Sequence, residues 1–236
     1  LNNIINKDIL QNRFHNIPEV KSIELLLQEK PINRIVFSRK RDPSYSKKEV
    51  YEKNMLIRRH SDANTKFPEV QVLSNGDYSL MITNDGSGYG KEKDMMLYRW
   101  REDPTTSIGG QYLYIKNLNS NEFWSATYEP CKHEGEEYEA IFSLDKAQYR
   151  RKDGNILTKL DVSIASYDNT EIRKLIITNN SDSTRYIEVT SYMEVTLSTY
   201  EADVAHPSFS NLFINTEYIE EDQCILASRR PRSKGE

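Results

Sequence analysis

Two adjoining stretches carry the side chains best suited to binding a polar ligand. The first, Asn84 to Lys91, holds three alternating glycines, and the second is Tyr98-Arg99-Trp100-Arg101-Glu102-Asp103. An aromatic ring at Tyr89 or Trp100 could stack on a sugar while charged groups bond its hydroxyls. A plainer interpretation is a hairpin whose tryptophan lies in the core and whose arginines pair with the adjacent acids. Composition alone favours this second interpretation, because a buried tryptophan is common.

The alternating glycines also raise the question of a phosphate-binding loop. Glycines let a backbone approach a ligand closely. A phosphate-binding loop needs a helix N-terminus directly after it, and the stretch fits neither the Walker spacing nor GxGxxG. The sequence therefore argues against nucleotide binding.

His206 is the histidine most suited to a functional role. It follows a predicted strand and lies in a predicted loop, Asp203-Val204-Ala205-His206-Pro207, and functional residues often lie on loops. General-base catalysis would need a positioned carboxylate, for which Asp203 is near in sequence, but a surface turn at an X-Pro bond explains the same residues. Carboxylate pairs such as Glu136-Glu137 would serve glycosidic chemistry only if they faced each other across the bond, which proximity along the chain does not show. The residues alone identify no catalytic group.

Short strands are expected to position these residues. Runs rich in β-branched and aromatic residues, separated by turns such as Asn75-Gly76, predict about a dozen strands in an antiparallel sandwich. The clearest run, Tyr186 to Leu197, predicts one long strand with a buried face at alternate residues from Ile187 and a wet face of tyrosines and polar groups. The charged stretch from Arg39 to Ala63 is expected to be a long surface excursion.

A helical lead segment is expected before the sandwich. Apolar residues recur at helical spacing from Ile17 to Glu29, and Pro31 ends the helix. We therefore divide the chain into a helical lead segment, residues 1–33, and a β-sandwich domain, residues 34–236. The chain does not begin with methionine and it ends on a polar, basic stretch, so we expect it to be cut from a larger protein.

Composition narrows the range of partners. The formal net charge is −4, from 32 basic and 36 acidic residues, which gives no strong field toward nucleic acid or an anionic membrane. No apolar run approaches the ~20 residues needed to cross a bilayer. The two cysteines lack CxxC spacing, which indicates free thiols in a reducing compartment. We expect a cytoplasmic protein with no metal or other cofactor and no contact with nucleic acid or membrane.

Several motifs, taken in order, resemble one family of carbohydrate-active enzymes. They are Leu73-Ser74-Asn75-Gly76-Asp77-Tyr78, Gly86-Ser87-Gly88-Tyr89, Tyr98-Arg99-Trp100-Arg101, Phe123-Trp124-Ser125-Ala126, Arg151-Lys152-Asp153-Gly154, Thr190-Ser191-Tyr192-Met193-Glu194-Val195, His206-Pro207-Ser208-Phe209 and Arg229-Arg230-Pro231-Arg232. Together they resemble the opening of the cyclic β-1,2-glucan synthase phosphorylase module, which is similar to the cellobiose phosphorylases of glycoside hydrolase family ninety-four. The stretch Tyr138 to Ser143 lacks the basic residue associated with acceptor glucose in cellobiose phosphorylase and looks closer to the β-1,2-glucan branch.

The resemblance implies a mainly β fold, an antiparallel two-sheet supersandwich of the galactose-mutarotase kind behind an N-terminal helical segment. It also implies an (α/α)6 barrel beyond Glu236 that carries the general acid and the inorganic phosphate site. In that family a β-glucosidic bond is phosphorolysed, or formed in reverse, without metal or nucleotide, and the sandwich borders the active-site mouth and often helps dimers form. This chain would then be a non-catalytic module, inactive alone, whose ligand is a β-glucan oligosaccharide.

By the same resemblance, seven residues are expected beside the sugar cleft: Asp85, Tyr89, Arg99, Trp100, Arg101, Asp103 and His206. Two other functions stay open: a free-standing carbohydrate-binding module, and a scaffold for a homodimer built on the tyrosine face of Tyr186 to Leu197. An aldose mutarotase would need a histidine and glutamate pair that the sequence does not show.

Overall fold

A computed structural model describes residues 49–52, 55–101 and 108–231, all within one compact unit, Lys47–Glu236. These residues form eighteen strands and two short helices, α3 (Tyr200–Ala205) and α4 (Pro207–Asn211). Every ladder described below is antiparallel, so the predicted mainly β, antiparallel fold is confirmed. The predicted lead helix, the predicted domain boundary between residues 33 and 34, and Asp103 lie outside the described residues.

One layer is a six-stranded sheet in the order β1-β2-β11-β12-β13-β14. Its strands are β1 (Glu49–Glu52), β2 (Met55–His60), β11 (Glu137–Phe142), β12 (Lys146–Asp153), β13 (Ile156–Ile164) and β14 (Glu171–Asn179). Burial alternates along β13, as expected where one face of a strand packs on a core. The expected surface excursion from Arg39 to Ala63 is wrong over β1 and β2, because Met55-Leu56-Ile57 begins a strand whose C-terminal end pairs with β11.

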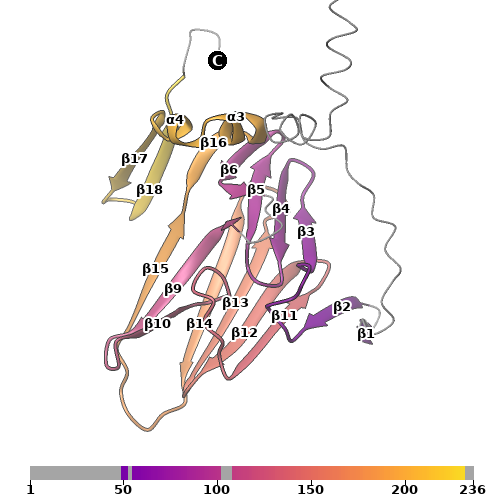
Figure 1. Ribbon diagram of the computed structural model, residues 1–236, viewed down its shortest axis with the longest axis vertical. Helices are drawn as coiled ribbons and strands as arrows, with labels where there is room; N and C mark the ends of the chain where they lie inside the picture. The colour runs from indigo at the N-terminus through magenta and orange to yellow at the C-terminus, as the bar shows by residue number, and fades with distance from the viewer. Residues whose placement is uncertain (1–48, 53–54, 102–107, 232–236) are drawn as a thin grey trace, which may run out of the picture. The chain divides into compact units, whose positions relative to one another are not determined.

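The second layer comprises two sheets (Figure 1). A five-stranded sheet has the order β16-β6-β5-β4-β3, and a three-stranded sheet has the order β10-β9-β15. Their strands are β3 (Val70–Ser74), β4 (Tyr78–Thr83), β5 (Gly88–Glu92), β6 (Met95–Tyr98), β9 (Gln111–Asn117), β10 (Glu122–Ser125), β15 (Ile187–Met193) and β16 (Val195–Thr199). Two further pairs complete the unit: β7 (Trp100–Arg101) with β8 (Ile108–Gly109), and β17 (Ile214–Ile219) with β18 (Cys224–Arg229).

The hydrophobic core contains side chains from both layers. Leu80, Ile82 and Ile115 come from the second layer, and Phe142 and Leu160 from the six-stranded sheet, and all are almost fully buried. Close packing of such side chains supplies most of the stability of a sandwich.

A polar cluster also joins the layers within this core. The hydroxyls of Tyr78 and Tyr98, on β4 and β6, both donate to Oε2 of Glu171 on β14, at 2.8 and 3.1 Å. Arg173 Nε donates to the other carboxylate oxygen at 2.5 Å. A buried carboxylate is costly unless its hydrogen bonds are met, and here both oxygens have partners. The cluster therefore fixes the register of β14 against β4 and β6.

The run from Tyr186 to Leu197 differs from its prediction. It breaks at Glu194 into β15, which pairs with β9, and β16, which pairs with β6. The expected buried face is also wrong for β15, where Val189 and Met193 are each 45% exposed. Both differences arise because the strand changes sheets at Glu194, so the alternation in the sequence continues while the pairing partner changes.

Candidate functional site

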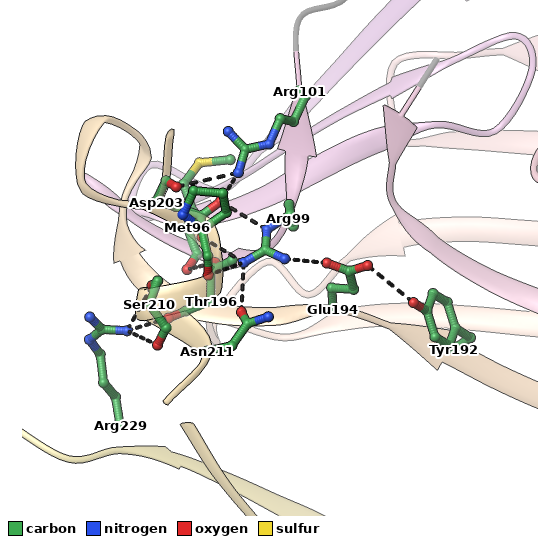
Figure 2. Close-up of polar contacts among 11 residues, drawn as sticks. Met96, Arg99, Arg101, Tyr192, Glu194, Thr196, Asp203, Ser210, Asn211 and Arg229 are labelled. Atoms are coloured by element: carbon green, nitrogen blue, oxygen red, sulfur yellow. Dashed lines mark hydrogen bonds and ion pairs between the residues drawn. The ribbon is translucent and has the colours of Figure 1, made fainter. Parts of the chain in front are cut away.

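Two arginines that flank Trp100 converge on one carboxylate (Figure 2). Arg99 follows β6 directly, and it donates from Nε to Asp203 Oδ2 at 3.0 Å and from Nη2 to Oδ1 at 2.8 Å. Arg101 donates from Nη2 to Asp203 Oδ2 at 3.0 Å. The side chain of Asp203, on α3, is only 6% exposed. These contacts hold α3 against the segment that carries Trp100, in the two-point geometry typical of arginine and carboxylate.

Every nitrogen of the Arg99 guanidinium has a hydrogen-bond partner within the protein. Nη1 donates to Glu194 Oε2, and Nη2 also donates to Asn211 Oδ1 at 2.7 Å. The pKa of Arg99 is raised, first by its hydrogen bonds to Asp203 and then by the charges of Asp203 and Glu194, which more than offset the effect of burial. Arg99 is therefore a positioning residue, because binding a ligand would require it to give up contacts within the protein.

Arg101 has spare capacity. Only its Nη2 is engaged among the described residues, with the carboxylate of Asp203 and, at 3.3 Å, its backbone carbonyl. The side chain is 23% exposed. The remaining N–H groups of its guanidinium can donate to hydroxyl groups of a ligand.

Three aromatic rings lie beside these arginines. The ring of Trp100 is 5.4 Å from that of Tyr89 on β5 and 6.5 Å from that of Tyr200 on α3, between ring centroids, in tilted arrangements. All three side chains are partly exposed. Trp100 is therefore not a core residue, and the cluster combines aromatic surface with donors of Arg101 that have no partner among the described residues. That combination suits a sugar, which has apolar faces and hydroxyl edges.

Gly86, in the loop between β4 and β5, and Gly90, on β5, serve the fold itself. A Cβ on Gly86 would lie 2.3 Å from the Cβ of Thr127, and one on Gly90 would lie 2.0 Å from the Tyr78 hydroxyl. Asp85 is buried in this loop, where its Oδ1 accepts from the Ser87 backbone N–H at 2.9 Å. The close approach that these glycines permit is therefore to other parts of the chain.

Asp85 does not lie with the arginines but reaches their segment through a relay. The hydroxyls of Ser87 and Tyr112 are 3.3 Å apart, and Tyr112 donates to the carbonyl of Gly109 at 2.9 Å. Gly109 pairs with Trp100 across β7 and β8. The expected role of Asp85 beside a sugar stays a prediction, and the structure gives it a supporting position.

His206 lies at the junction of α3 and α4 and is exposed. Its carbonyl accepts from the Ser210 backbone N–H at 2.8 Å, so the backbone begins the turn that the X-Pro pattern predicts. Asp203, the carboxylate considered as its partner, is bonded on both oxygens by the arginines. The carboxylate of a catalytic dyad is therefore engaged elsewhere, and the expected place of His206 beside a sugar stays a prediction.

The structure thus brings together Tyr89, Arg99, Trp100 and Arg101 and adds residues that sequence reasoning missed. Tyr200, Glu194 and Asn211 were not predicted as site residues. Asp203 was considered as a partner for His206 and, with Glu201, as a carboxylate pair, but not as a partner of the arginines. A signal for α3 does exist in the sequence, because Thr199 caps it by accepting from the Ala202 N–H and acidic residues occupy the first turn.

A hollow lies next to this site. A groove of about 860 Å³ runs beside α3, with a lining that includes Met95, Leu197 and Ala202. Its lining does not include the three aromatic residues or the two arginines described above, which are Tyr89, Trp100, Tyr200, Arg99 and Arg101. The described residues contain no group of three or more His, Cys, Asp or Glu side chains able to hold a metal ion. No helix of the described part is long and apolar enough to span a membrane.

Most of the chain matches one known family of enzymes. Residues 53–236 match the model of the glycosyl hydrolase 94 supersandwich domain. The chain belongs to glycosyl hydrolase family 94. The resemblance inferred from the motifs is thereby confirmed, and so is the supersandwich fold of the described residues.

Several curated proteins are similar to this family 94 chain. The cyclic beta-(1,2)-glucan synthase NdvB of Rhizobium meliloti (strain 1021) is 34% identical over 99% of this chain, which corresponds to 8% of that protein. Solabiose phosphorylase of Paenibacillus borealis is 28% identical over 53% of the chain and 16% of that protein. N,N'-diacetylchitobiose phosphorylase of Vibrio proteolyticus is 22% identical over 64% of the chain and 20% of that protein. The chain therefore spans a fifth or less of the length of these relatives.

Proposed function

We propose that this chain is a non-catalytic supersandwich module of a β-glucan phosphorylase or cyclic glucan synthase, and that it borders the sugar cleft of an (α/α)6 barrel outside this chain. The observation that carries the proposal is the similarity to the Rhizobium glucan synthase along 99% of the chain at 34% identity. The phosphorylases are similar over only 53% and 64% of it, at lower identity. A β-1,2-linked glucan is therefore the first ligand to test.

The proposal that the module is non-catalytic rests on the carboxylates near Tyr89, Trp100 and Tyr200. Glycosidic chemistry needs a carboxyl group that can present a proton or a lone pair to the reacting bond. Both oxygens of Asp203 accept hydrogen bonds from arginines. The oxygens of Glu194 are bonded by Arg99 and Tyr192. Neither group is free for that work.

The cleft-bordering part rests on Arg101 and Trp100. The contact between Arg99 and Asp203 joins the end of β6 to α3. Within the part of the chain that the structure describes, Arg101 has donors without a partner, and Trp100 is partly exposed. A fixed surface with free donors and an aromatic ring can orient a sugar without a catalytic group of its own. A cytoplasmic location is part of the proposal, because Cys131 and Cys224 are free thiols, which suit a reducing compartment.

Two experiments test the proposal. The 236-residue chain, given β-1,2-gluco-oligosaccharides and inorganic phosphate, should release no glucose 1-phosphate. In a longer protein that contains both this module and the barrel, Arg101→Ala should raise KM for the glucan about tenfold with little change in kcat, as expected for lost binding that does not alter the chemical step. Lys174→Ala, which removes an exposed charge on β14, is the control. Release of glucose 1-phosphate by the chain alone, or an unchanged KM, would contradict the proposal.

A further inference from the structure

One face of the β10-β9-β15 sheet gathers aromatic side chains at the surface. Tyr114 on β9 and Tyr192 on β15 have ring centroids 6.3 Å apart in an edge-to-face arrangement. Phe123 on β10 is 60% exposed and Tyr192 is 46% exposed. The register places Phe123 opposite Lys116, one side-chain step along this face from Tyr114. Exposed aromatic rings on adjacent strands form a shallow platform, which we call the β9 platform.

The β9 platform surrounds a hollow whose lining includes polar and charged side chains. The hollow has a volume of about 420 Å³ and is lined by Tyr114, Lys116, Asn121, Phe123, Glu188 and Thr190. Lys116 and Glu188 are direct partners in the register of β9 and β15, yet among the described residues neither side chain forms an ion pair or hydrogen bond. Their charges cancel, and their donors and acceptors remain available.

We propose that the β9 platform binds the glucan at a second site, distinct from the surface at Trp100 and Arg101. A glucan is an uncharged polyol whose rings present C–H faces to aromatic side chains and hydroxyls to polar ones. The lining of the platform matches both features, and its balanced charge suits a neutral ligand. The volume lies within the range of ordinary small-ligand pockets, roughly 300–1,000 Å³. The inference rests on the proposed function, from which the class of ligand is taken.

The chemistry of the platform fits a sugar better than a second copy of the chain. The centres of protein interfaces are depleted in lysine and glutamate, and here Lys116 and Glu188 both line the hollow. An interface over this hollow would have to remove both charged groups from water, at a cost in free energy that their mutual attraction offsets only in good geometry. A sugar hydroxyl can satisfy either group.

The platform is connected to the site at Arg99. Tyr192 donates its hydroxyl to Glu194 Oε1 at 3.2 Å, and the other oxygen of Glu194 accepts from Arg99 Nη1 (Figure 2). The seven residues of β15 span roughly 20 Å and end beside this contact. A glucan held along β15 would therefore end close to the Arg99 cluster, and the platform would retain a long chain near the proposed cleft.

The experiment is isothermal titration of the 236-residue chain with β-1,2-gluco-oligosaccharides, beside β-1,4 oligosaccharides. Phe123→Ala should weaken binding of the β-1,2 series about tenfold, because it removes one stacked ring. Lys116→Ala should weaken it by a smaller factor. The matched control is Tyr218→Ala, which removes a ring that is also 60% exposed but lies on the β17-β18 hairpin, and it should bind like the unaltered chain.

Each outcome separates the platform from the proposed function. Binding that Phe123→Ala weakens and Tyr218→Ala does not supports the platform. Binding that Trp100→Ala abolishes while Phe123→Ala leaves unchanged overturns the platform and leaves the proposed function standing. Absence of any binding also overturns the platform, and the KM of the longer protein then tests the proposed function separately. Light scattering that shows a dimer lost in Phe123→Ala, with no effect of glucan, overturns the platform in favour of self-association.

Discussion

Arg99 and Asp203, 104 positions apart in the chain, form a two-point contact in which Nε and Nη2 of the guanidinium meet the two carboxylate oxygens at 3.0 and 2.8 Å. This contact joins the end of β6 to α3. Trp100 and Arg101 follow Arg99 directly, so their orientation depends on it. The contact therefore supports the candidate site from within the fold, and we expect its loss to lower the free energy of unfolding.

Asp203→Asn should lower the free energy of unfolding by about 3 kcal/mol. The change keeps the shape of the side chain but removes the counter-charge that Arg99 and Arg101 share, and breaking a buried pair typically costs 3–5 kcal/mol. The side chains of Arg99 and Asp203 are only 11% and 6% exposed, so solvent screens the pair little. Urea unfolding followed by circular dichroism measures the change.

Glu201→Gln is the matched control, because Glu201 lies on the same helix, is exposed and is also acidic. It should shift the free energy of unfolding by no more than about 0.5 kcal/mol, as surface substitutions do. Equal losses in the two variants would show that α3 depends on overall charge and that the two-point contact has no special role.

Gly90→Ala should destabilise the protein through Tyr78. The new Cβ would lie 2.0 Å from the Tyr78 hydroxyl, which donates to Glu171 across the core. Overpacking of this kind costs about 1–3 kcal/mol. In a Tyr78→Phe background the hydroxyl is gone, so the same change should cost less, and a double-mutant cycle of unfolding free energies measures the coupling. Additive losses would show that the collision is relieved elsewhere.

The local features of this fold were predictable, and the pairings between distant segments were not. Turn residues such as Asn75-Gly76 and alternating side chains act over a few positions, so antiparallel strands could be inferred. The change of sheet at Glu194 leaves the alternation intact, and the sequence contains no sign of it. Strand β2 was missed because its short apolar run is surrounded by charges.

Some residues of the candidate site could be predicted from the sequence, and their distant partners could not. Tyr89, Arg99, Trp100 and Arg101 could be selected by residue type and motif, and the structure places them together. Their partners on α3 and at Glu194 are about a hundred positions away, and a single sequence does not indicate such contacts. The assignment of donors follows only from the structure. It separates Arg99, whose contacts are internal, from Arg101, which engages only Nη2 among the described residues.

The two thiols should differ in reactivity. Burial raises the pKa of Cys131, so less of the reactive thiolate is present at neutral pH. Cys224 is exposed on β18. Iodoacetamide should therefore label Cys224 first, as followed by peptide mass spectrometry over time. Cys224→Ser should lose the fast phase and Cys131→Ser should keep it. Equal labelling rates in the unaltered chain would contradict the expectation.

Alkaline pH should destabilise the fold through its buried tyrosines. Burial raises the pKa values of Tyr78, Tyr98 and Tyr149 well above the ordinary value for a tyrosine. The charge of Glu171 raises those of Tyr78 and Tyr98 further. When the pH rises past about 10, the unfolded chain releases phenolic protons that the folded chain keeps. The unfolded state then binds fewer protons, so the free energy of unfolding falls as pH rises.

Urea unfolding at a series of alkaline pH values measures this slope. Tyr98→Phe removes one buried phenol, so the slope should become shallower by up to about 1.4 kcal/mol per pH unit. Ile82→Val, in the same core, is the control: it should lower stability by about 1 kcal/mol at every pH and leave the slope unchanged, because it removes no titrating group. A slope that Tyr98→Phe leaves intact would show that Tyr98 ionises equally in both states, and alkaline unfolding would then have to come from other groups.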